Sequence, residues 1–465
     1  MPETDFDVIV VGSGAAGLAA AATAGAAGAR VLVVESEKRT GGSSRLSDAI
    51  LQAAGTSIQR ASGVQDSPDA MFEYYMTLNR WQVEPGLARA FCDDAPRIVE
   101  WLGTIGLEFA TVEFAGNEPI PRGHPTVGMG EALIAALEAE SRRRGVELAL
   151  DNRVDELLVD GDGRIRGVRA RGEDAIAPAV VLAAGGFAHN SELIRRYLGN
   201  RMLGGDHPVS PAGPGSVGDA LVMGEAVGAA IAGRDRAHWV PGPMVPAEVV
   251  LLNQDGRRFV DESADHSVRT IVANYHGHTY YAIFDEPIRQ AGAANSFVAR
   301  TEAAFLFGNE PLRADVEPVA MWIRNGALAQ GDTPGAAARG VGLDPDAVEA
   351  AIERYNDSCA RGRDEAFEKD AAALLPLRTA PFFAARIQPV MLVATFCGLR
   401  IDTDARVLDT AGRAIPGLFA AGESAGGIVG DVYAGHGNSI TTALVFGRRA
   451  GRNAAATSQA DVPVR

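Results

Sequence analysis

The feature that most constrains the fold is a glycine-rich turn between two short apolar runs near the start of the chain. Residues 8–11 are all valine or isoleucine, the turn is Gly12-Ser13-Gly14-Ala15-Ala16-Gly17, and residues 31–34 form a second apolar run that ends on Glu35. This pattern predicts a buried strand, a tight turn, an alanine-rich helix and a second strand.

Each glycine of the turn has a mechanical purpose if a dinucleotide binds there. Gly12 allows the sharp turn out of the strand, Gly14 lets the backbone approach a pyrophosphate, and Gly17 lets the helix pack on the sheet. The N–H groups and positive dipole at the helix N-terminus point at phosphate. Glu35 stands where an acid accepts hydrogen bonds from a ribose. The turn therefore predicts a dinucleotide site.

A second stretch matches the glycine spacing without its context. Gly213-Pro214-Gly215-Ser216-Val217-Gly218 follows proline and serine residues rather than an apolar strand. We predict a loop there, because the spacing alone is a weak signal.

Composition and charge narrow the class of protein. The 465 residues exceed what one hydrophobic core usually serves, so two domains are expected. A formal charge of −16 disfavours nucleic acid and anionic membranes as partners. Cys92, Cys359 and Cys397 are isolated and predict neither haem attachment nor disulfides. Eight histidines without an i, i+4 pair predict no metal site.

Location is predicted from the chain start and from the length of its apolar runs. The first strand begins too early to leave room for a signal peptide, and no run reaches the length of a membrane span. We therefore expect a cytoplasmic protein that is not an integral membrane protein.

The remaining pattern predicts alternating helical and strand regions. Residues 69–101 have helical periodicity, with Met71, Tyr74, Tyr75 and Leu78 on one face. Strands are expected at 146–150, 154–159, 165–170, 179–184, 398–401, 407–408 and 418–421, a hairpin at 249–260, and helices at 344–360 and 439–455. The Gly41-Gly42-Ser43-Ser44 segment suits a loop against phosphate or a flat ring.

The strand meander after residue 145, which returns to an apolar strand ending in Ala183-Ala184-Gly185-Gly186, resembles the FAD-binding domain of two-domain flavoproteins. Ala184 replaces the threonine that is common there. The whole chain resembles the flavoprotein superfamily of soluble fumarate reductases and 3-ketosteroid dehydrogenases. The motifs that carry this likeness also include the Asn253–Glu262 stretch, Arg354-Tyr355-Asn356, and Ile415-Pro416-Gly417 through Glu423.

The resemblance implies an α/β fold, a noncovalent FAD and two domains. Residues 1–236 and 394–465 would form a Rossmann-like FAD-binding domain, and 237–393 an inserted α+β capping domain. The FAD residues would be Gly12, Gly14, Ala15, Ala16, Gly17, Glu35, Ser36, Gly41, Gly42, Ser43, Ser44, Val154, Ala184, Gly185, Gly422, Glu423, Asn438, Ser439 and Ile440. No histidine stands near Gly42, where relatives attach flavin covalently.

The resemblance also bears on the substrate. The cap arginine, the histidine and the carboxylate-binding arginine of fumarate reductases fall on His266, on Ala394 and near Tyr433. The chain therefore lacks the cationic side chains that would bind the two carboxylates of a dicarboxylate. Arg400 and His238 stay candidates for binding a monocarboxylate.

The stretch from Tyr433 to Gly437 resembles the Tyr-x-Gly-x-Gly of 3-ketosteroid dehydrogenases. In those enzymes the tyrosine hydroxyl and a glycine N–H bind the ketone oxygen, which stabilises the enolate formed when a base removes the α-proton. The base position falls on His266, and neutral imidazole is a suitable base near pH 7.

Other histidines leave alternatives open. His124, in Arg122-Gly123-His124-Pro125, is either a second catalytic group or a loop histidine. His276 and His278, near Tyr275, Tyr280 and Tyr281, form either a second cluster or a surface hairpin. His436 either adjoins the flavin or supports its loop.

We therefore expect an FAD-dependent dehydrogenase that introduces a C=C bond next to the carbonyl of a cyclic ketone, either a 3-oxosteroid or a cyclohexanone-like ring. One alternative is a reductase of an activated alkene, and another is a non-catalytic flavin-binding sensor. The sequence has no haem motif or iron–sulfur cysteine set, so an external acceptor is expected, either a quinone or a redox protein.

Overall fold

The computed structural model describes residues 5–116, 118–199, 210–242, 245–264, 268–269, 272–273, 275–276, 279–294, 326 and 328–460. The chain divides into two compact units. The first comprises Met1–Gly199, Pro211–His238 and Val393–Arg465, and the second comprises Asn200–Ser210 and Trp239–Leu392. The first unit thus takes in both ends of the chain.

The first unit is built on a six-stranded sheet of order β17-β18-β9-β1-β2-β5. Its strands are β1 (Val8–Val11), β2 (Val31–Val34), β5 (Glu147–Ala149), β9 (Ala179–Leu182), β17 (Arg406–Leu408) and β18 (Ala414–Ala420). All neighbours pair in parallel except β17 and β18. All side chains of β1 and β9 are buried, as expected for strands covered on both faces.

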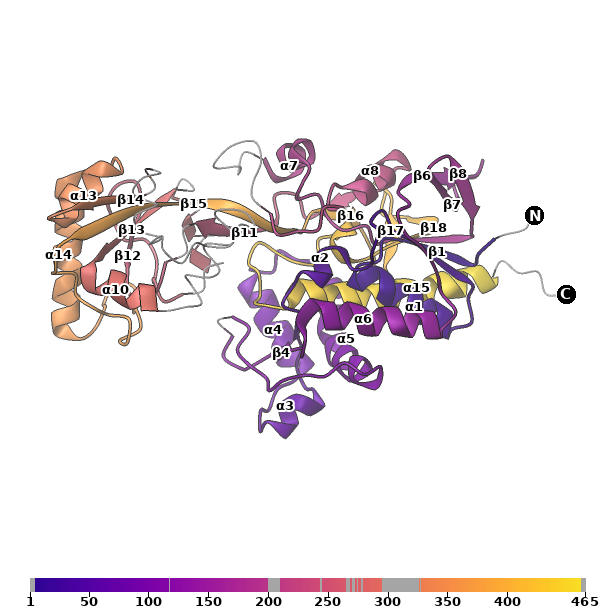
Figure 1. Ribbon diagram of the computed structural model, residues 1–465, viewed down its shortest axis with the longest axis horizontal. Helices are drawn as coiled ribbons and strands as arrows, with labels where there is room; N and C mark the ends of the chain where they lie inside the picture. The colour runs from indigo at the N-terminus through magenta and orange to yellow at the C-terminus, as the bar shows by residue number, and fades with distance from the viewer. Residues whose placement is uncertain are drawn as a thin grey trace. The chain divides into compact units, whose positions relative to one another are not determined.

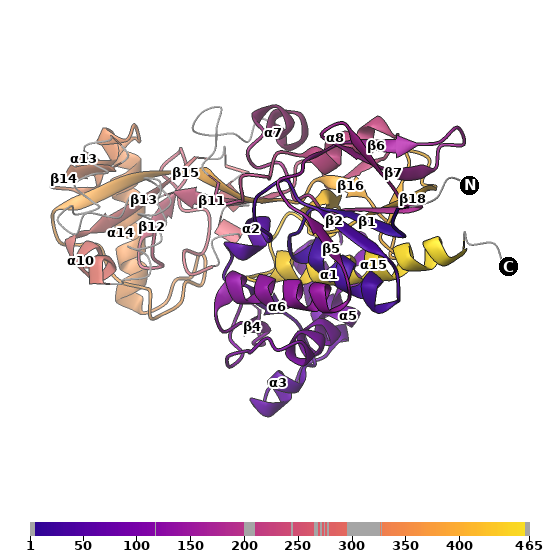
Figure 2. The same ribbon diagram turned by 45° about the vertical axis from the view of Figure 1, so that its right-hand side comes forward.

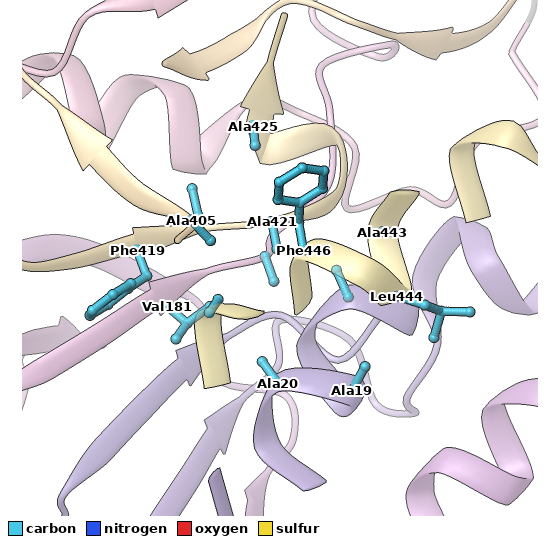
Figure 3. Packing of buried hydrophobic residues seen from close by; sticks show 14 of the residues in the cluster. Ala19, Ala20, Val181, Ala405, Phe419, Ala421, Ala425, Ala443, Leu444 and Phe446 are labelled. Atoms are coloured by element: carbon cyan, nitrogen blue, oxygen red, sulfur yellow. The ribbon is translucent and has the colours of Figure 1, made fainter. Parts of the chain in front are cut away.

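Three long helices lie side by side along one face of this sheet (Figures 1 and 2). They are α1 (Ala15–Ala26), α6 (Met129–Arg143) and α15 (Asn438–Ala460). Gly447 and Gly451 of α15 lie so close to α1 that an added Cβ would overlap the Ala16 and Ala20 carbonyls. Figure 3 shows the resulting core, to which α1 contributes Ala19 and Ala20, β9 Val181, β18 Phe419, and α15 Leu444 and Phe446.

The predicted strand–turn–helix–strand start and the strand meander are confirmed. The meander consists of β6 (Val154–Val159), β7 (Ile165–Ala170) and β8 (Glu173–Ile176), the last of which was not predicted. The predicted helical region at 69–101 contains two helices, α4 (Pro68–Leu78) and α5 (Pro85–Thr104). Pro85 begins α5, because proline is tolerated in a first helical turn.

Shorter elements complete the first unit. They are α2 (Gly42–Arg45), β3 (Ile50–Gln52), α3 (Ser57–Ala61), β4 (Gly123–Pro125), α7 (Ser191–Leu198), α8 (Asp219–Ala226), β10 (Ile231–Ala232), β16 (Gly398–Arg400), η2 (Gly422–Ser424) and β19 (Ala425–Gly426). β3 pairs with β4 in antiparallel fashion. The segment 213–218 is a loop before α8, as predicted.

The second unit contains a sheet of order β11-β15-β13-β12, with β14 beside β15. Its elements are β11 (Ala237–Gly242), β12 (Val250–Leu252), β13 (Tyr280–Asp285), α10 (Glu286–Ala294), β14 (Leu328–Gly331), α13 (Pro334–Gly340), α14 (Pro345–Arg361) and β15 (Phe382–Thr395). The return arm of the predicted hairpin is reduced to one bridge between Leu252 and Arg258, and β12 also pairs with β13. Asp344 caps α14 as predicted.

Charged residues of the Asn253–Glu262 stretch are part of the interior of the second unit. Arg258 donates to both oxygens of Glu262 at 2.8 and 2.6 Å and to Asp364 at 3.0 and 2.7 Å. Its guanidinium lies over the rings of Tyr355 and Phe367. Lys369 donates to the Val249 carbonyl and to Tyr355. These contacts give Arg258 and Glu262 a structural role, because burying either charge without its partner is costly.

No helix in the described part of the chain is long and apolar enough to cross a membrane. The described residues contain no group of three or more His, Cys, Asp or Glu side chains able to hold a metal ion.

Candidate cofactor and catalytic site

The glycine turn between β1 and α1 has the close contacts that its spacing predicts. Gly12 has a φ of +99°. An added Cβ at Gly12 would overlap the Ala183 carbonyl, and one at Gly17 would overlap the Gly12 carbonyl. Gly14 is the N-cap of α1 and provides no side-chain cap. The helix N-terminus therefore presents backbone N–H groups at the carboxyl ends of parallel strands, the usual place for a dinucleotide phosphate.

Glu35 is buried at the end of β2, and local groups hold both of its carboxylate oxygens. Ser13 donates to one oxygen through its N–H at 2.8 Å and its hydroxyl at 2.5 Å. The Ser36 hydroxyl and the Glu37 N–H donate to the other at 3.1 and 2.9 Å. These four hydrogen bonds use the approximately four lone-pair positions of the carboxylate, and the ribose contact of Glu35 stays a prediction.

The Gly41–Ser44 segment lies directly against the N-terminus of α1. Ala15 N–H donates to the Ser44 hydroxyl at 3.2 Å, and Gly41 N–H donates to the Ser13 carbonyl at 3.1 Å. Gly41 has a φ of +112°, which glycine adopts without strain. These contacts bring the two segments predicted to bind the cofactor together.

The second glycine-rich loop lies against the same segments, which sequence reasoning did not anticipate. Gly213 N–H donates to the Ser43 hydroxyl at 2.9 Å, and Gly215 N–H donates to Glu37 at 3.3 Å. An added Cβ at Gly213 would come within 2.9 Å of the Gly42 carbonyl carbon. The sequence signal for this contact was the presence of Gly213 and Gly215 themselves, because a position where two backbone segments approach closely favours glycine.

A second group of predicted FAD residues meets at the carboxyl ends of β9 and β18. Ser424 donates to the Gly185 carbonyl at 3.1 Å. Glu423 accepts from the N–H and hydroxyl of Thr395 at 3.0 and 3.2 Å. Burial raises the pKa of Glu423, and the two Thr395 bonds oppose that rise. Val154 is buried at the start of β6, and nearby Asn152 donates to the Glu35 carbonyl.

The start of α15 contains polar atoms that lack protein partners. Asn438 Oδ1 and Ser439 Oγ are buried and have no hydrogen-bond partner among the described residues. Ile440, next in the chain, packs against the core of the first unit. Buried polar atoms without partners cost free energy, so a ligand that supplies them fits this position. Together with the crowded glycines, they fit a bound dinucleotide.

Tyr433 lies among apolar and aromatic side chains just before α15. Its ring centroid is 4.4 Å from that of His238 and 5.7 Å from that of Phe396, and it packs against the buried Ala394, Phe396 and Val429. Its hydroxyl accepts a hydrogen bond from Ser439 N–H at 3.2 Å. Burial raises the pKa of Tyr433 from its ordinary value of 10.0, and a tyrosine hydroxyl keeps its proton at neutral pH even without that rise. That proton is available to a ligand oxygen.

Hydrogen bonds with Gln52 and Ala115 fix the segment between Tyr433 and Asn438. Gln52 donates to the Ala434 carbonyl at 2.6 Å and accepts from Asn438 at 3.1 Å. The N–H of His436, which is exposed, donates to the Ala115 carbonyl at 2.6 Å. Gly437 has a φ of +89°, and an added Cβ would overlap the Ile50 carbonyl. Within the described residues, nothing accepts a hydrogen bond from the Gly437 N–H.

His124 is a core residue in this structure. It is fully buried on β4, with Nε2 2.8 Å from the Thr56 hydroxyl and Nδ1 2.9 Å from the Arg122 carbonyl. Burial lowers its pKa. Because both ring nitrogens have protein partners, these contacts favour a structural role for His124 over the catalytic alternative.

The other candidate residues are in different settings or lie outside the described part of the chain. His266 and His278 lie outside the described residues. His276 is exposed and its ring packs on Phe259 at 5.2 Å, beside the buried Tyr280. Arg400 is exposed on β16, whereas His238 is buried against Tyr433. Of the two candidate anion binders, only His238 adjoins the tyrosine.

A protein-family model described as "FAD binding domain" matches residues 7–440. The chain is similar to fumarate reductase (cytochrome) of Shewanella frigidimarina, 31% identical over 98% of this chain and 78% of that protein. It is also similar to urocanate reductase of Eggerthella lenta, 32% identical over 97% of this chain and 75% of that protein. 3-Oxosteroid 1-dehydrogenase of Mycolicibacterium smegmatis is 26% identical over 99% of both proteins.

Other comparisons bear on length and shape. The chain spans 48% of NADH:fumarate oxidoreductase of Klebsiella pneumoniae, with 30% identity. Its fold is similar to the solved structure of 3-ketosteroid-Δ4-(5α)-dehydrogenase from Rhodococcus jostii in complex with 4-androstene-3,17-dione. The TM-score is 0.82, with 27% identity and 98% of each chain covered.

Proposed function

Because the chain belongs to the family of proteins with this FAD-binding domain, whose relatives are oxidoreductases, we propose that it is an FAD-dependent dehydrogenase of cyclic ketones. It would introduce a C=C bond next to the carbonyl of a 3-oxosteroid or a cyclohexanone-like ring. The observation that carries this proposal is the hydroxyl of Tyr433, which accepts a backbone hydrogen bond and keeps its own proton in an apolar setting.

Tyr433 and Gly437 would bind the ketone oxygen. The bond from Ser439 N–H to the tyrosine oxygen occupies an acceptor site and leaves the O–H as a donor. The Gly437 N–H supplies a second donor four positions further on. Donors that are already oriented stabilise the negative charge that develops on a carbonyl oxygen as its α-proton leaves, and each is worth about 10²–10³ in turnover.

The side chains around Tyr433 favour an apolar ring as the substrate rather than a dicarboxylate. Ala394, Phe396 and Val429 are buried beside the tyrosine, and none of them carries charge. Arg400 is exposed on β16. A dicarboxylate needs cationic groups that compensate for its desolvation, since burying an unpaired carboxylate is costly. A ring held by apolar contacts and one carbonyl bond does not.

The reaction would break two C–H bonds and form one C=C bond. A base removes the α-hydrogen as a proton, and we propose His266 for this role. When bound, FAD supplies the acceptor for the β-hydrogen as hydride. Tyr433 and Gly437 would bind the oxygen throughout, and the carbonyl would form again as the hydride leaves and the double bond appears. We further propose that FAD is bound noncovalently and that a quinone or redox protein takes up the electrons.

Reduction of an activated alkene is the second candidate. The relatives at 31% and 32% identity are named as reductases of fumarate and urocanate. The same tyrosine proton would polarise the carbonyl of an enone or an unsaturated acid as the double bond is reduced. His238, beside Tyr433, would then contact the substrate carboxylate.

Two anaerobic half-reactions, followed by the visible absorbance of the flavin, test the proposal. Oxidised protein is mixed with saturated cyclic ketones, including 3-oxosteroids, and dithionite-reduced protein with fumarate and other unsaturated acids. We expect a ketone to bleach the flavin, and His266→Ala to abolish that bleaching. Reoxidation by an unsaturated acid, with no bleaching by any ketone, would replace the dehydrogenase by the reductase.

A further inference from the structure

We propose that Asn79, in the turn between α4 and α5, is a positioning residue that fixes the hydroxyl of Tyr433. The inference rests on the proposed function of Tyr433 and adds a residue that does not touch the reacting atoms. It follows from the way that the turn and the segment before Tyr433 are joined.

Asn79 joins a helix end to the residue that precedes Tyr433. Its side chain is fully buried, with Nδ2 donating to the Tyr75 carbonyl at 3.1 Å and Oδ1 accepting from Val432 N–H at 3.1 Å. Gly430 leaves no room for a Cβ, because that atom would overlap the Asn79 amide. Val432 is also buried, so removing the amide would leave its N–H without a partner.

Further contacts hold the same segment to α4, to the turn and to Arg236. The Tyr75 hydroxyl donates to the Ile428 carbonyl at 2.9 Å. Asp431 pairs with Arg80 at 3.0 Å and with Arg236 at 3.4 Å. Arg80 and the adjacent Trp81 have φ values of +51° and +57°. Such conformations cost free energy outside glycine, so surrounding contacts must maintain the turn.

Tyr433 therefore stands between two fixed segments. On one side the turn holds residues 428–432, and on the other Gln52 holds Ala434 and Asn438. The tyrosine hydroxyl and the Gly437 N–H must point at one oxygen atom, so a shift of either segment would misalign them. A misplacement of 1 Å at a reacting centre costs about 10²-fold in rate.

The first test is Asn79→Ala, alone and combined with Tyr433→Phe. We expect kcat of the single variant to fall about 10- to 10²-fold, with little change in KM, because the oxygen contact strengthens in the transition state. FAD content should equal that of the unaltered protein. In the Tyr433→Phe background, Asn79→Ala should cause no further fall, because the hydroxyl that it positions is gone.

Asn356→Ala is the matched control. Asn356 also bridges backbone groups, accepting from Leu377 N–H at 2.8 Å and donating to the Leu377 carbonyl at 2.9 Å, but in the second unit. Its effect on kcat, whatever its size, should multiply with that of Tyr433→Phe. Asp431→Asn is the milder variant if Asn79→Ala does not fold. Its partly exposed ion pairs predict a fall of about 2- to 5-fold, also absent in the Tyr433→Phe background.

The outcomes separate the inference from the proposed function. If Tyr433→Phe retains full turnover, the role of the tyrosine is wrong and the proposed function fails with it. If Tyr433→Phe is impaired but the effects of Asn79→Ala and Asp431→Asn multiply with it, the proposed function stands and the positioning role is overturned. Loss of both effects in the Tyr433→Phe background supports the positioning role.

Discussion

Two loops of the first unit, the turn at residues 12–17 and the segment at 428–438, share one steric feature but are held in place by different kinds of contact. Both place a glycine of positive φ, Gly12 or Gly437, against a neighbouring backbone carbonyl. The first turn connects two consecutive elements, β1 and α1, and the distant group that crowds Gly12 is the Ala183 carbonyl. The second is held by Gln52, Asn79 and Ala115, all more than 300 positions earlier in the chain.

The difference teaches which parts of such a site a motif can specify. The turn at 12–17 has one backbone shape that serves any dinucleotide phosphate. The segment at 428–438 instead aims one hydroxyl and one N–H, and their direction depends on contacts from several elements. We therefore expect variants of the first loop to affect cofactor binding and variants of the second to affect turnover.

Gly12→Ala should have the largest effect. Alanine would have to keep the positive φ of Gly12, which is unfavourable for it, and its Cβ would overlap the Ala183 carbonyl. The two effects together should lower the free energy of unfolding by about 2–6 kcal/mol. We expect purified protein without flavin and a lower Tm. Absorbance at the flavin maximum and thermal unfolding measure both. Normal flavin content would mean that the turn does not contact the cofactor.

Tyr433→Phe should have the second-largest effect. Unlike Gly12→Ala, it should lower turnover while the flavin stays bound. The ring still packs between His238 and Phe396, so the fold and the flavin should be retained. Flavin reduction by a cyclic ketone should slow at least about 10²-fold, because one donor to the developing oxyanion is lost. Stopped-flow absorbance at saturating ketone is the measurement, and a rate close to normal would contradict the dehydrogenase proposal.

His124→Gln should change the pH dependence of stability and leave turnover close to normal. Burial lowers the pKa of His124 below its ordinary value of 6.5, so below about pH 6.5 the unfolded chain binds a proton that the folded one resists. The unaltered protein should thus lose stability as pH falls from 7 toward 5, and the variant should lose less. Denaturant unfolding at several pH values tests this, while a large fall in turnover would restore the catalytic role.

Arg400→Ala should have the smallest effect. The side chain is exposed, so the change in unfolding free energy should stay within about 0.5 kcal/mol. Flavin reduction by ketones should not change. A selective loss of flavin reoxidation by unsaturated acids would show that Arg400 binds a carboxylate, and would favour the reductase.

Prediction from the sequence succeeded where the signal was local. The β1–α1–β2 unit, the meander and the capped helix α14 follow from periodicity and turn residues within short windows. It failed where a neighbour distant in sequence decided the outcome. The predicted return arm of the 249–260 hairpin is only a bridge at Arg258, while the main partner of β12 is β13, about 30 residues further along the chain. The role of His124 depended on Thr56, which no pattern around residue 124 reveals.

The sequence by itself determined the strand–turn–helix–strand unit at residues 8–35 and the long helix near the C-terminal end of the chain. These are properties of glycine spacing and apolar runs, which act over a few residues. Only the tertiary structure decided that Tyr433 lies among apolar side chains and that Asn79 holds the segment before it. Burial and hydrogen-bond partners arise from packing between distant segments, and short sequence patterns do not carry that information.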